Sequence, residues 1–119
     1  MTTAVAPYLI RAYHQWMEDS GLTPHILVNC KDTDVSVPKQ FIQDDKIVLN
    51  IGTSATSGLD LSNEQITFKA RFDGKPFSVV VPAQAVVSIY ATESGEGMFF
   101  GGQEEAPKKN PKPGLKILD

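Results

Sequence analysis

The chain has 119 residues, of which 41% are hydrophobic and 21% charged. A chain of this length suits one domain and is too short for two independent cores. Its formal net charge of -3 argues against a general nucleic-acid-binding protein, because such proteins gather Lys and Arg on one surface. With Cys30 as the one cysteine, no cationic leader and no apolar run near the roughly 20 residues of a membrane helix, we expect a cytoplasmic protein without a disulfide or membrane anchor.

The first predicted element is an amphipathic helix over Pro7 to Ser20. Proline suits a first helical turn, apolar residues then recur at helical spacing, and Gly21 offers a C-cap. Such an aromatic-rich stripe covers the core of its own chain, a partner subunit, or both. The residues of this stripe are Tyr8, Leu9, Ala12, Tyr13, Trp16 and Met17.

After Pro24 the sequence changes to short apolar segments separated by turn residues, which is typical of a β domain. Asp73-Gly74 predicts a tight hairpin turn, and Ser94 to Gly97 predicts a second hairpin. Pro82 is expected to open a single helical turn, whereas Gly52 to Gly58 is interpreted as a plain loop. The predicted strands are His25 to Cys30, Ile47 to Ile51, Gln65 to Phe72, Lys75 to Val81 and Val86 to Ala91, with Met98 to Phe100 closing the second hairpin.

Few residues offer catalytic or metal-binding chemistry. His14, His25 and Cys30 do not have the spacing of a metal-ligand set, and both histidines are expected to be structural. Asp44-Asp45 is interpreted as a turn, because neighbouring residues of an extended chain point to opposite sides. We therefore predict no enzyme, no cofactor and no metal site.

The sequence from Gly101 to Lys112 is rich in glycine, proline and charge, and predicts a flexible linker. Leu115, Lys116, Ile117 and Leu118 then form an apolar and basic tip. Apolar residues at the end of a linker suggest a docking peptide. The alternative is a last strand that folds back on the domain.

Several stretches of the sequence resemble the stringent starvation protein B (SspB) family, adaptors that deliver tagged polypeptides to the ClpXP protease. The stretches are PYLIRAYHQWMEDSGLTPHILV at Pro7, VPKQF at Val37, DDKIVLNI at Asp44, FKARF at Phe68 and VPAQAVVSIYATESGEGMFF at Val81. They follow one another in unbroken order over almost the whole predicted folded part.

The resemblance implies a mainly β (α+β) fold, an Sm-like and partly open antiparallel barrel or sandwich preceded by one N-terminal helix. Residues 1–100 would form the peptide-binding domain, 101–112 the flexible linker and 113–119 the tail that docks on ClpX. The resemblance further implies no catalysis and a homodimer formed through the helix. Its interface residues would be Tyr8, Leu9, Ala12, Tyr13 and Trp16.

Two binding sites are expected from the resemblance. One is a groove for the degradation tag of stalled nascent chains, in which the small Ala70 leaves room for peptide; the alternative is that its residues are simply core. The candidates are Phe41, Leu49, Phe68, Ala70, Phe72, Met98 and Phe100. The other is a docking segment for the N-terminal zinc-binding domain of ClpX, made of Pro113, Leu115, Lys116, Ile117 and Leu118.

Two other functions stay open at this stage. An Sm-like fold is also used by RNA-binding modules, although the acidic composition argues against that role. The linker is short, with a root-mean-square span of roughly 20 Å, and the terminal Asp119 stands where the family usually has a basic residue. An adaptor that sequesters tagged proteins without delivering them is therefore the second alternative.

Overall fold

The computed structural model describes residues 4–31 and 34–100. One helix precedes seven strands, and two short 3-10 turns, η1 and η2, interrupt them. In chain order the elements are α1 Ala6–Asp19, β1 Pro24–Asn29, η1 Lys39–Phe41, β2 Lys46–Asn50, β3 Ser57–Leu61, β4 Gln65–Phe72, β5 Lys75–Pro82, η2 Ala83–Ala85, β6 Val86–Ala91 and β7 Gly97–Phe99.

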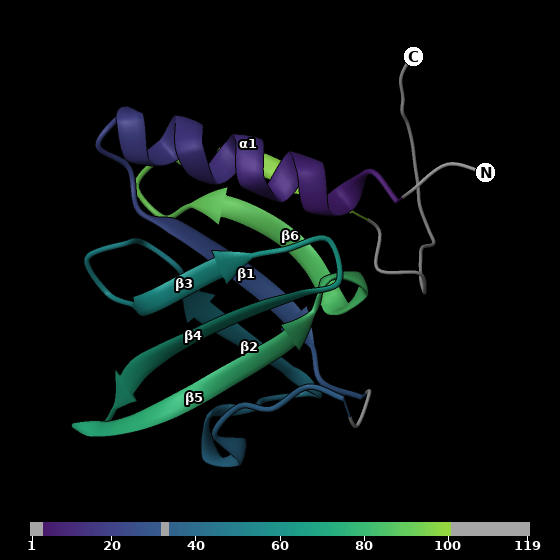
Figure 1. The fold of residues 1–119 in the computed structure, drawn as a ribbon, viewed down its shortest axis with the longest axis vertical. Helices are drawn as coiled ribbons and strands as arrows, with labels where there is room; N and C mark the ends of the chain where they lie inside the picture. Colours follow the sequence, from purple (N-terminus) through teal and green to yellow (C-terminus); the bar gives the residue numbers. More distant parts are fainter. Residues whose placement is uncertain (1–3, 32–33, 101–119) are drawn as a thin grey trace.

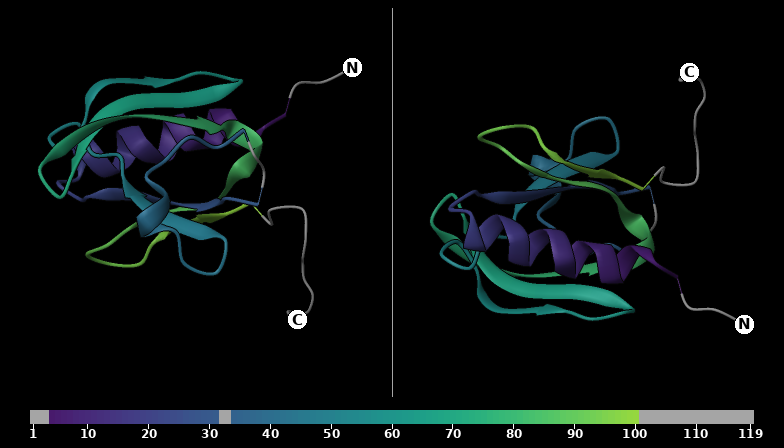
Figure 2. Two further views of the ribbon diagram at one scale, coloured as in Figure 1. Left: turned by 90° about the horizontal axis from the view of Figure 1, so that it is seen from below. Right: turned by 90° about the horizontal axis from the view of Figure 1, so that it is seen from above.

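The strands form two antiparallel sheets, one with the order β2-β1-β6-β7 and one with the order β3-β4-β5. The sheets do not close into a barrel, and helix α1 lies across β1 and β6 on one side of the molecule (Figure 1). The two further views show the three-stranded sheet and the four-stranded sheet on either side of the helix axis (Figure 2). These features confirm the predicted mainly β, partly open architecture.

The predicted turns lie where the sequence indicated them. Asp73 and Gly74 have φ angles of 54° and 80°, and they connect β4 to β5 in a hairpin whose register pairs Phe72 with Lys75. Asp44 and Asp45 also have positive φ angles, 53° and 63°, and form the turn between Gln43 and Lys46. The 3-10 turn η2 follows Pro82 as expected.

Strand β3 corrects one sequence interpretation, because it begins inside the segment Gly52 to Gly58 that was interpreted as a loop. It pairs with the outer edge of β4, with a register shift between Ser57 and Asp60. Gly58, with a φ of 66°, lies within that shift. Glycine lowers the β-strand propensity of this segment. Its extended conformation is therefore explained by its pairing with the edge of β4 that β5 leaves free.

The core lies between the two sheets and under the helix. Helix α1 turns Pro7, Ile10, His14 and Met17 inward, a spacing of three and four residues. The residues of the predicted apolar stripe are therefore divided between the core and the surface. Met17 is buried, while Tyr8 and Trp16 remain 46% and 42% exposed. Among the described residues, no helix is long and apolar enough to span a membrane.

Candidate functional site

The inner face of the β4–β5 hairpin passes from buried to half-buried along its length. Ile66 and Phe68 are 1% and 4% exposed, whereas Ala70 and Phe72, the next residues on the same face, are half-buried. Ala70 lies opposite the half-buried Phe77 of β5. The hairpin therefore extends beyond the core and exposes an apolar face near its turn.

Three phenylalanines gather at this end of the hairpin and are called the aromatic cluster: Phe41, Phe72 and Phe77. The rings of Phe41 and Phe72 lie 5.5 Å apart, and those of Phe72 and Phe77 lie 6.2 Å apart at an angle of 86°. These separations are those of favourable aromatic pairs. The cluster therefore joins η1 to the β4–β5 hairpin.

The chain brings Phe41 to this place by crossing from one sheet to the other. Ser36 exchanges two backbone hydrogen bonds with Val80 of β5, at 2.8 and 3.0 Å. The 3-10 turn η1 follows, and Gln43 then exchanges hydrogen bonds with Lys46, the first residue of β2. Phe41 lies between these two anchors.

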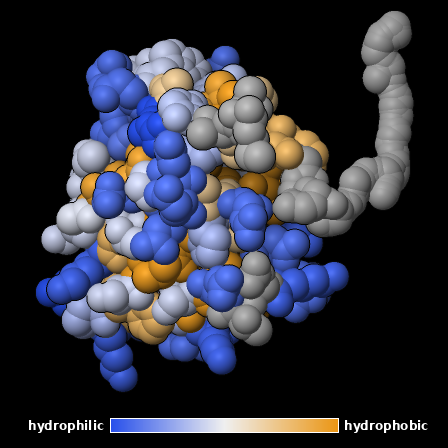
Figure 3. Space-filling view, turned by 45° about the vertical axis from the view of Figure 1, so that its right-hand side comes forward, coloured by the Kyte–Doolittle hydropathy of each residue, from blue (hydrophilic) through white to orange (hydrophobic). Residues whose placement is uncertain are grey.

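A groove of about 470 Å³ opens beside the aromatic cluster, along strand β2. Its volume is in the range of small-molecule and peptide side-chain pockets. Apolar areas reach the surface between hydrophilic side chains on the face shown in Figure 3. The lining residues of the groove are Leu27, Phe41, Gln43, Lys46, Ile47, Val48 and Phe72.

The structure brings together some of the predicted peptide-binding residues and separates others. Phe41 and Phe72 line the groove, and Ala70 is the next residue on the same face of β4. Leu49 and Phe68 are 2% and 4% exposed and belong to the core.

Met98 and Phe100 lie elsewhere. Met98 is in β7 and Phe100 follows it, and β7 is separated from β2 by β1 and β6 in the sheet order. Three spacings between strands amount to about 14 Å. These two residues are therefore not among those that line the groove.

Sequence reasoning named only Leu49 of β2 for the groove and missed the lining residues Lys46, Ile47 and Val48 of β2 and Leu27 of β1. Val48 is 50% exposed although Ile47 and Leu49 on either side are buried. The strand-like run at Ile47 to Ile51 predicted an alternation, and an apolar residue at its outward position was the available signal. Leu27 lies directly opposite Val48 on β1 and shares its face.

A second apolar surface lies on the outward side of helix α1. Ala12, Tyr13 and Trp16 line a shallow depression of about 210 Å³. The rings of Tyr13 and Trp16 meet edge to face at 6.2 Å. With Tyr8, which is exposed, these residues form the outer helix face; Leu9 is half-buried beside them.

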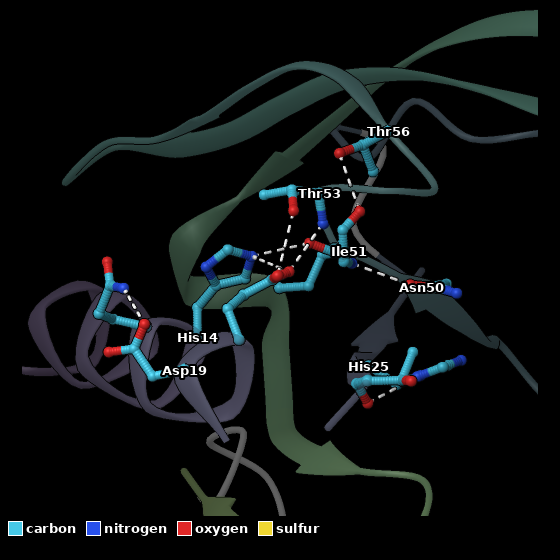
Figure 4. A network of polar contacts seen from close by, with 11 residues as sticks. His14, Asp19, His25, Asn50, Ile51, Thr53 and Thr56 are labelled. Carbon is cyan, nitrogen blue, oxygen red and sulfur yellow. Dashed lines mark hydrogen bonds and ion pairs between the residues drawn. The ribbon is translucent and has the colours of Figure 1, made fainter. Parts of the chain in front are cut away.

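A polar network fastens the inward side of the same helix to the start of the β2–β3 connection (Figure 4). The Nε2 atom of His14 lies 2.8 Å from the carbonyl oxygen of Ile51, and since a carbonyl only accepts, Nε2 carries the proton. Glu18 accepts hydrogen bonds from the backbone N–H and the hydroxyl of Thr53, at 2.7 and 3.1 Å. His14 is therefore a structural histidine, as predicted.

The remaining candidates for chemistry are also structural. His25 lies 3.3 Å from the carbonyl oxygen of Thr23 through Nδ1, and its ring packs on Tyr90. Burial, and then the charge of Asp45, raise the pKa of the Cys30 thiol, which keeps it in the weakly nucleophilic protonated form. Within residues 4–31 and 34–100, no three His, Cys, Asp or Glu side chains gather as a metal-ligand set.

The predicted docking residues Pro113, Leu115, Lys116, Ile117 and Leu118 lie outside the described residues.

Comparison with known proteins covers most of the chain. The sequence model of the family described as stringent starvation protein B matches residues 4–115. A stringent starvation protein B homolog from Haemophilus influenzae is 40% identical over 107 residues, which cover 90% of this chain and 71% of the relative. The chain therefore belongs to the stringent starvation protein B family.

Proposed function

We propose that this protein is a non-enzymatic, cytoplasmic adaptor of the ClpXP protease that binds the degradation tag of stalled nascent polypeptides. The observation that carries the proposal is the groove beside the aromatic cluster, in a chain of this family. Most of the residues that line the groove are apolar, and the groove is open to the surface, which suits a bound peptide.

The peptide contacts are assigned to the exposed half of the hairpin and to β2. Phe41 and Phe72 offer ring faces to apolar tag residues, and Ala70 leaves space beside Phe77. Lys46 lines the groove and has no carboxylate within ion-pair distance among the described residues. Its ammonium group therefore favours a tag that carries an acidic residue.

The outer helix face is the proposed dimer interface. It presents Tyr8, Ala12 and Trp16 at the surface, together with Tyr13, which is half-buried and also packs against the core. Large aromatic residues exposed together are typical of surfaces that bind a partner. A homodimer would present two grooves and two tails to one protease.

The tail supplies the second contact of the proposed mechanism. Residues 113–118 would bind the N-terminal domain of ClpX while the groove holds the tag. Capture of the tag by the unfoldase then becomes effectively intramolecular, which raises its local concentration without any stronger single contact.

The test is degradation of a tagged reporter by ClpXP with the full chain, without it, and with a chain truncated before Leu115. We expect the full chain to accelerate degradation at low substrate concentration. The truncated chain should bind tag peptide with unchanged affinity but give no acceleration.

Two results would contradict the proposal in different ways. Acceleration that persists after truncation would refute tethering through the tail. If the full chain binds the tag but slows degradation, the protein sequesters tagged substrates instead of delivering them.

A further inference from the structure

A further depression, which we call the Trp16 depression, lies beside the outer helix face. Its volume is about 500 Å³, and it is open to the surface. Helix α1 forms one side of it, and the turn that leads from β6 into β7 forms the other. The lining residues are Tyr13, Trp16, Gly95, Glu96 and Gly97. Because Tyr13 and Trp16 also line the smaller depression at Ala12, the two depressions adjoin.

The two sides of the Trp16 depression differ in chemistry. The helix side is aromatic, with Trp16 42% exposed and its ring edge to face with Tyr13. The turn side carries the carboxylate of Glu96. No Lys or Arg within residues 4–31 and 34–100 lies within ion-pair distance of this carboxylate. Such a surface favours a ligand that has apolar side chains and a cation close together.

The end of this chain has the composition of such a ligand. Leu115, Ile117 and Leu118 are apolar, and Lys116 stands between the first two. These four residues, which we call the tip, lie outside the described residues. The linker before them adds three further lysines. The tip therefore complements the Trp16 depression both in apolar character and in charge.

The length of chain before the tip suits this destination. Gly97 lines the depression, and Phe100, the last described residue, follows three positions later, which amounts to about 10 Å of extended chain. Residues 101–114 connect Phe100 to the tip, and a flexible chain of that length has a root-mean-square span of roughly 20 Å. A tether of this size holds its end near the depression at a local concentration in the millimolar range. Even a weak contact would therefore be populated.

We infer that the tip binds in the Trp16 depression of its own chain when the protein is monomeric. Its apolar side chains lie against Trp16, and the ammonium group of Lys116 pairs with Glu96. The same helix face is the proposed dimer interface, so a second copy and the tip compete for it. Dimerisation then releases the tip for ClpX, a consequence that rests on the proposed function, whereas the contact itself does not.

The fluorescence of Trp16 tests the contact directly, because the chain has one tryptophan. The full chain and a chain truncated before Leu115 are compared over a range of concentrations in which sedimentation measures the fraction of dimer. Among the monomers, truncation should shift the emission maximum to longer wavelength and increase quenching by acrylamide. Equal emission and quenching in the two chains at every concentration would overturn the inference, whether a second copy covers Trp16 or nothing does.

The strength of the dimer gives an independent readout from the same two chains. If the tip occupies the depression for about three-quarters of the time, the free fraction of each chain falls about fourfold, and the dimer dissociation constant rises roughly sixteenfold. We therefore expect the truncated chain to dimerise more tightly than the full chain. Dimers of equal strength would refute the competition between the tip and a second copy.

Charge reversal tests the pairing that orients the tip. Glu96→Lys and Lys116→Glu should each bring the fluorescence of the full monomer close to that of the truncated chain, and the double variant should restore the parent's fluorescence. Lys108→Glu, in the linker, is the matched control and should change little. A double variant without rescue would overturn the pairing and with it the placement of the tip.

The outcome for the tip is distinguishable from the outcome for the proposed function. Fluorescence and sedimentation measure the contact without tag peptide or protease, whereas acceleration of reporter degradation measures delivery. A full chain that protects Trp16 through its tip but gives no acceleration would support the contact and refute delivery. Acceleration without any effect of the tip on Trp16 would do the reverse.

Discussion

The helix side and the groove side of this two-sheet domain differ in how completely their side chains are buried and their polar groups hydrogen-bonded. On the helix side, Ile10 and Met17 are fully buried, and His14 and Glu18 find hydrogen-bond partners in Ile51 and Thr53. On the groove side, aromatic residues stay half-buried, and the edge of β2 keeps outward backbone groups. Stability and binding are therefore assigned to different regions of a small domain.

This difference teaches that the apolar content of an element does not reveal its role. Helix α1 is apolar on both sides, but only the side that carries a histidine faces the core. The β4–β5 hairpin is apolar along one face, but only its first half is buried. Substitutions on either side of each element can separate the two roles.

The largest expected effect is the loss of stability in Met17→Ala. Met17 has 0% exposure, and truncation of a buried methionine typically costs about 2–5 kcal/mol. The control is Trp16→Ala on the outer helix face, which should cost less than about 1 kcal/mol in the monomer. Urea unfolding, at a protein concentration where the chain is monomeric, measures both. Equal costs would show that the two helix faces have been assigned wrongly.

The next effect is the loss of tag binding in Ala70→Gln. A glutamine opposite Phe77 would fill the space beside the aromatic cluster, so peptide affinity should fall more than about tenfold, with little change in the thermal melt. Lys69→Gln is the matched control, because Lys69 lies on the opposite, exposed face of β4. Fluorescence anisotropy with a labelled tag peptide measures the difference, and unaltered affinity in Ala70→Gln would remove Ala70 from the site.

A smaller effect is expected for Glu18→Ala. This change removes two hydrogen bonds to Thr53 at a partly exposed site, and should cost about 1 kcal/mol of unfolding free energy. Asp19→Ala, one residue further along the helix, removes only an exposed contact with Gln15 and should cost less. Neither variant should change tag affinity, because the polar network lies away from the groove lining. A loss of affinity in Glu18→Ala would show that the two regions are coupled.

The smallest effect concerns pH and Glu93. Hydrogen bonds from the side chain and backbone of Thr23 lower the pKa of this exposed carboxyl. A lowered pKa in the folded state contributes stability above the carboxyl's unfolded pKa, about 4.3, and this contribution disappears as the pH falls through the folded value. The melting temperature of the parent should therefore exceed that of Glu93→Gln slightly at pH 7 and converge with it in acid. A difference that grows in acid would contradict this sign.

Much of the fold could be predicted because local signals and tertiary contacts agree. Strands β4 and β6 have the predicted bounds, and the turn at Asp73 and Gly74 uses the residues that positive φ angles favour. Strand β3 could not be predicted, because its extended form depends on pairing with β4 and not on its own residues.

The sequence predicted which face of β4 contributes to the candidate site, but not which residues of that face are buried in the core. Alternation assigns Phe68, Ala70 and Phe72 to one face of β4, yet it does not tell where the core ends along that face. For the same reason alternation did not reveal that Leu49 is only 2% exposed, since both faces of β2 carry apolar residues. The structural role of His14 was predicted, but its partner was not, because the carbonyl of Ile51 is 37 residues away in the sequence.

Gly97 has a consequence for how the described part of the chain ends. A side chain at this position would place its Cβ only 1.9 Å from the carbonyl oxygen of Ile89, so β7 can lie against β6 only with glycine there. Three residues later, the N–H of Phe100 donates to the carbonyl of Val87 at 2.7 Å. Gly97, which does not line the groove, therefore fixes the position of Phe100, the last residue that the structure describes. If the tail binds ClpX as proposed, a substitution at Gly97 would impair delivery by displacing the start of the tail, while the residues that line the groove stay unchanged.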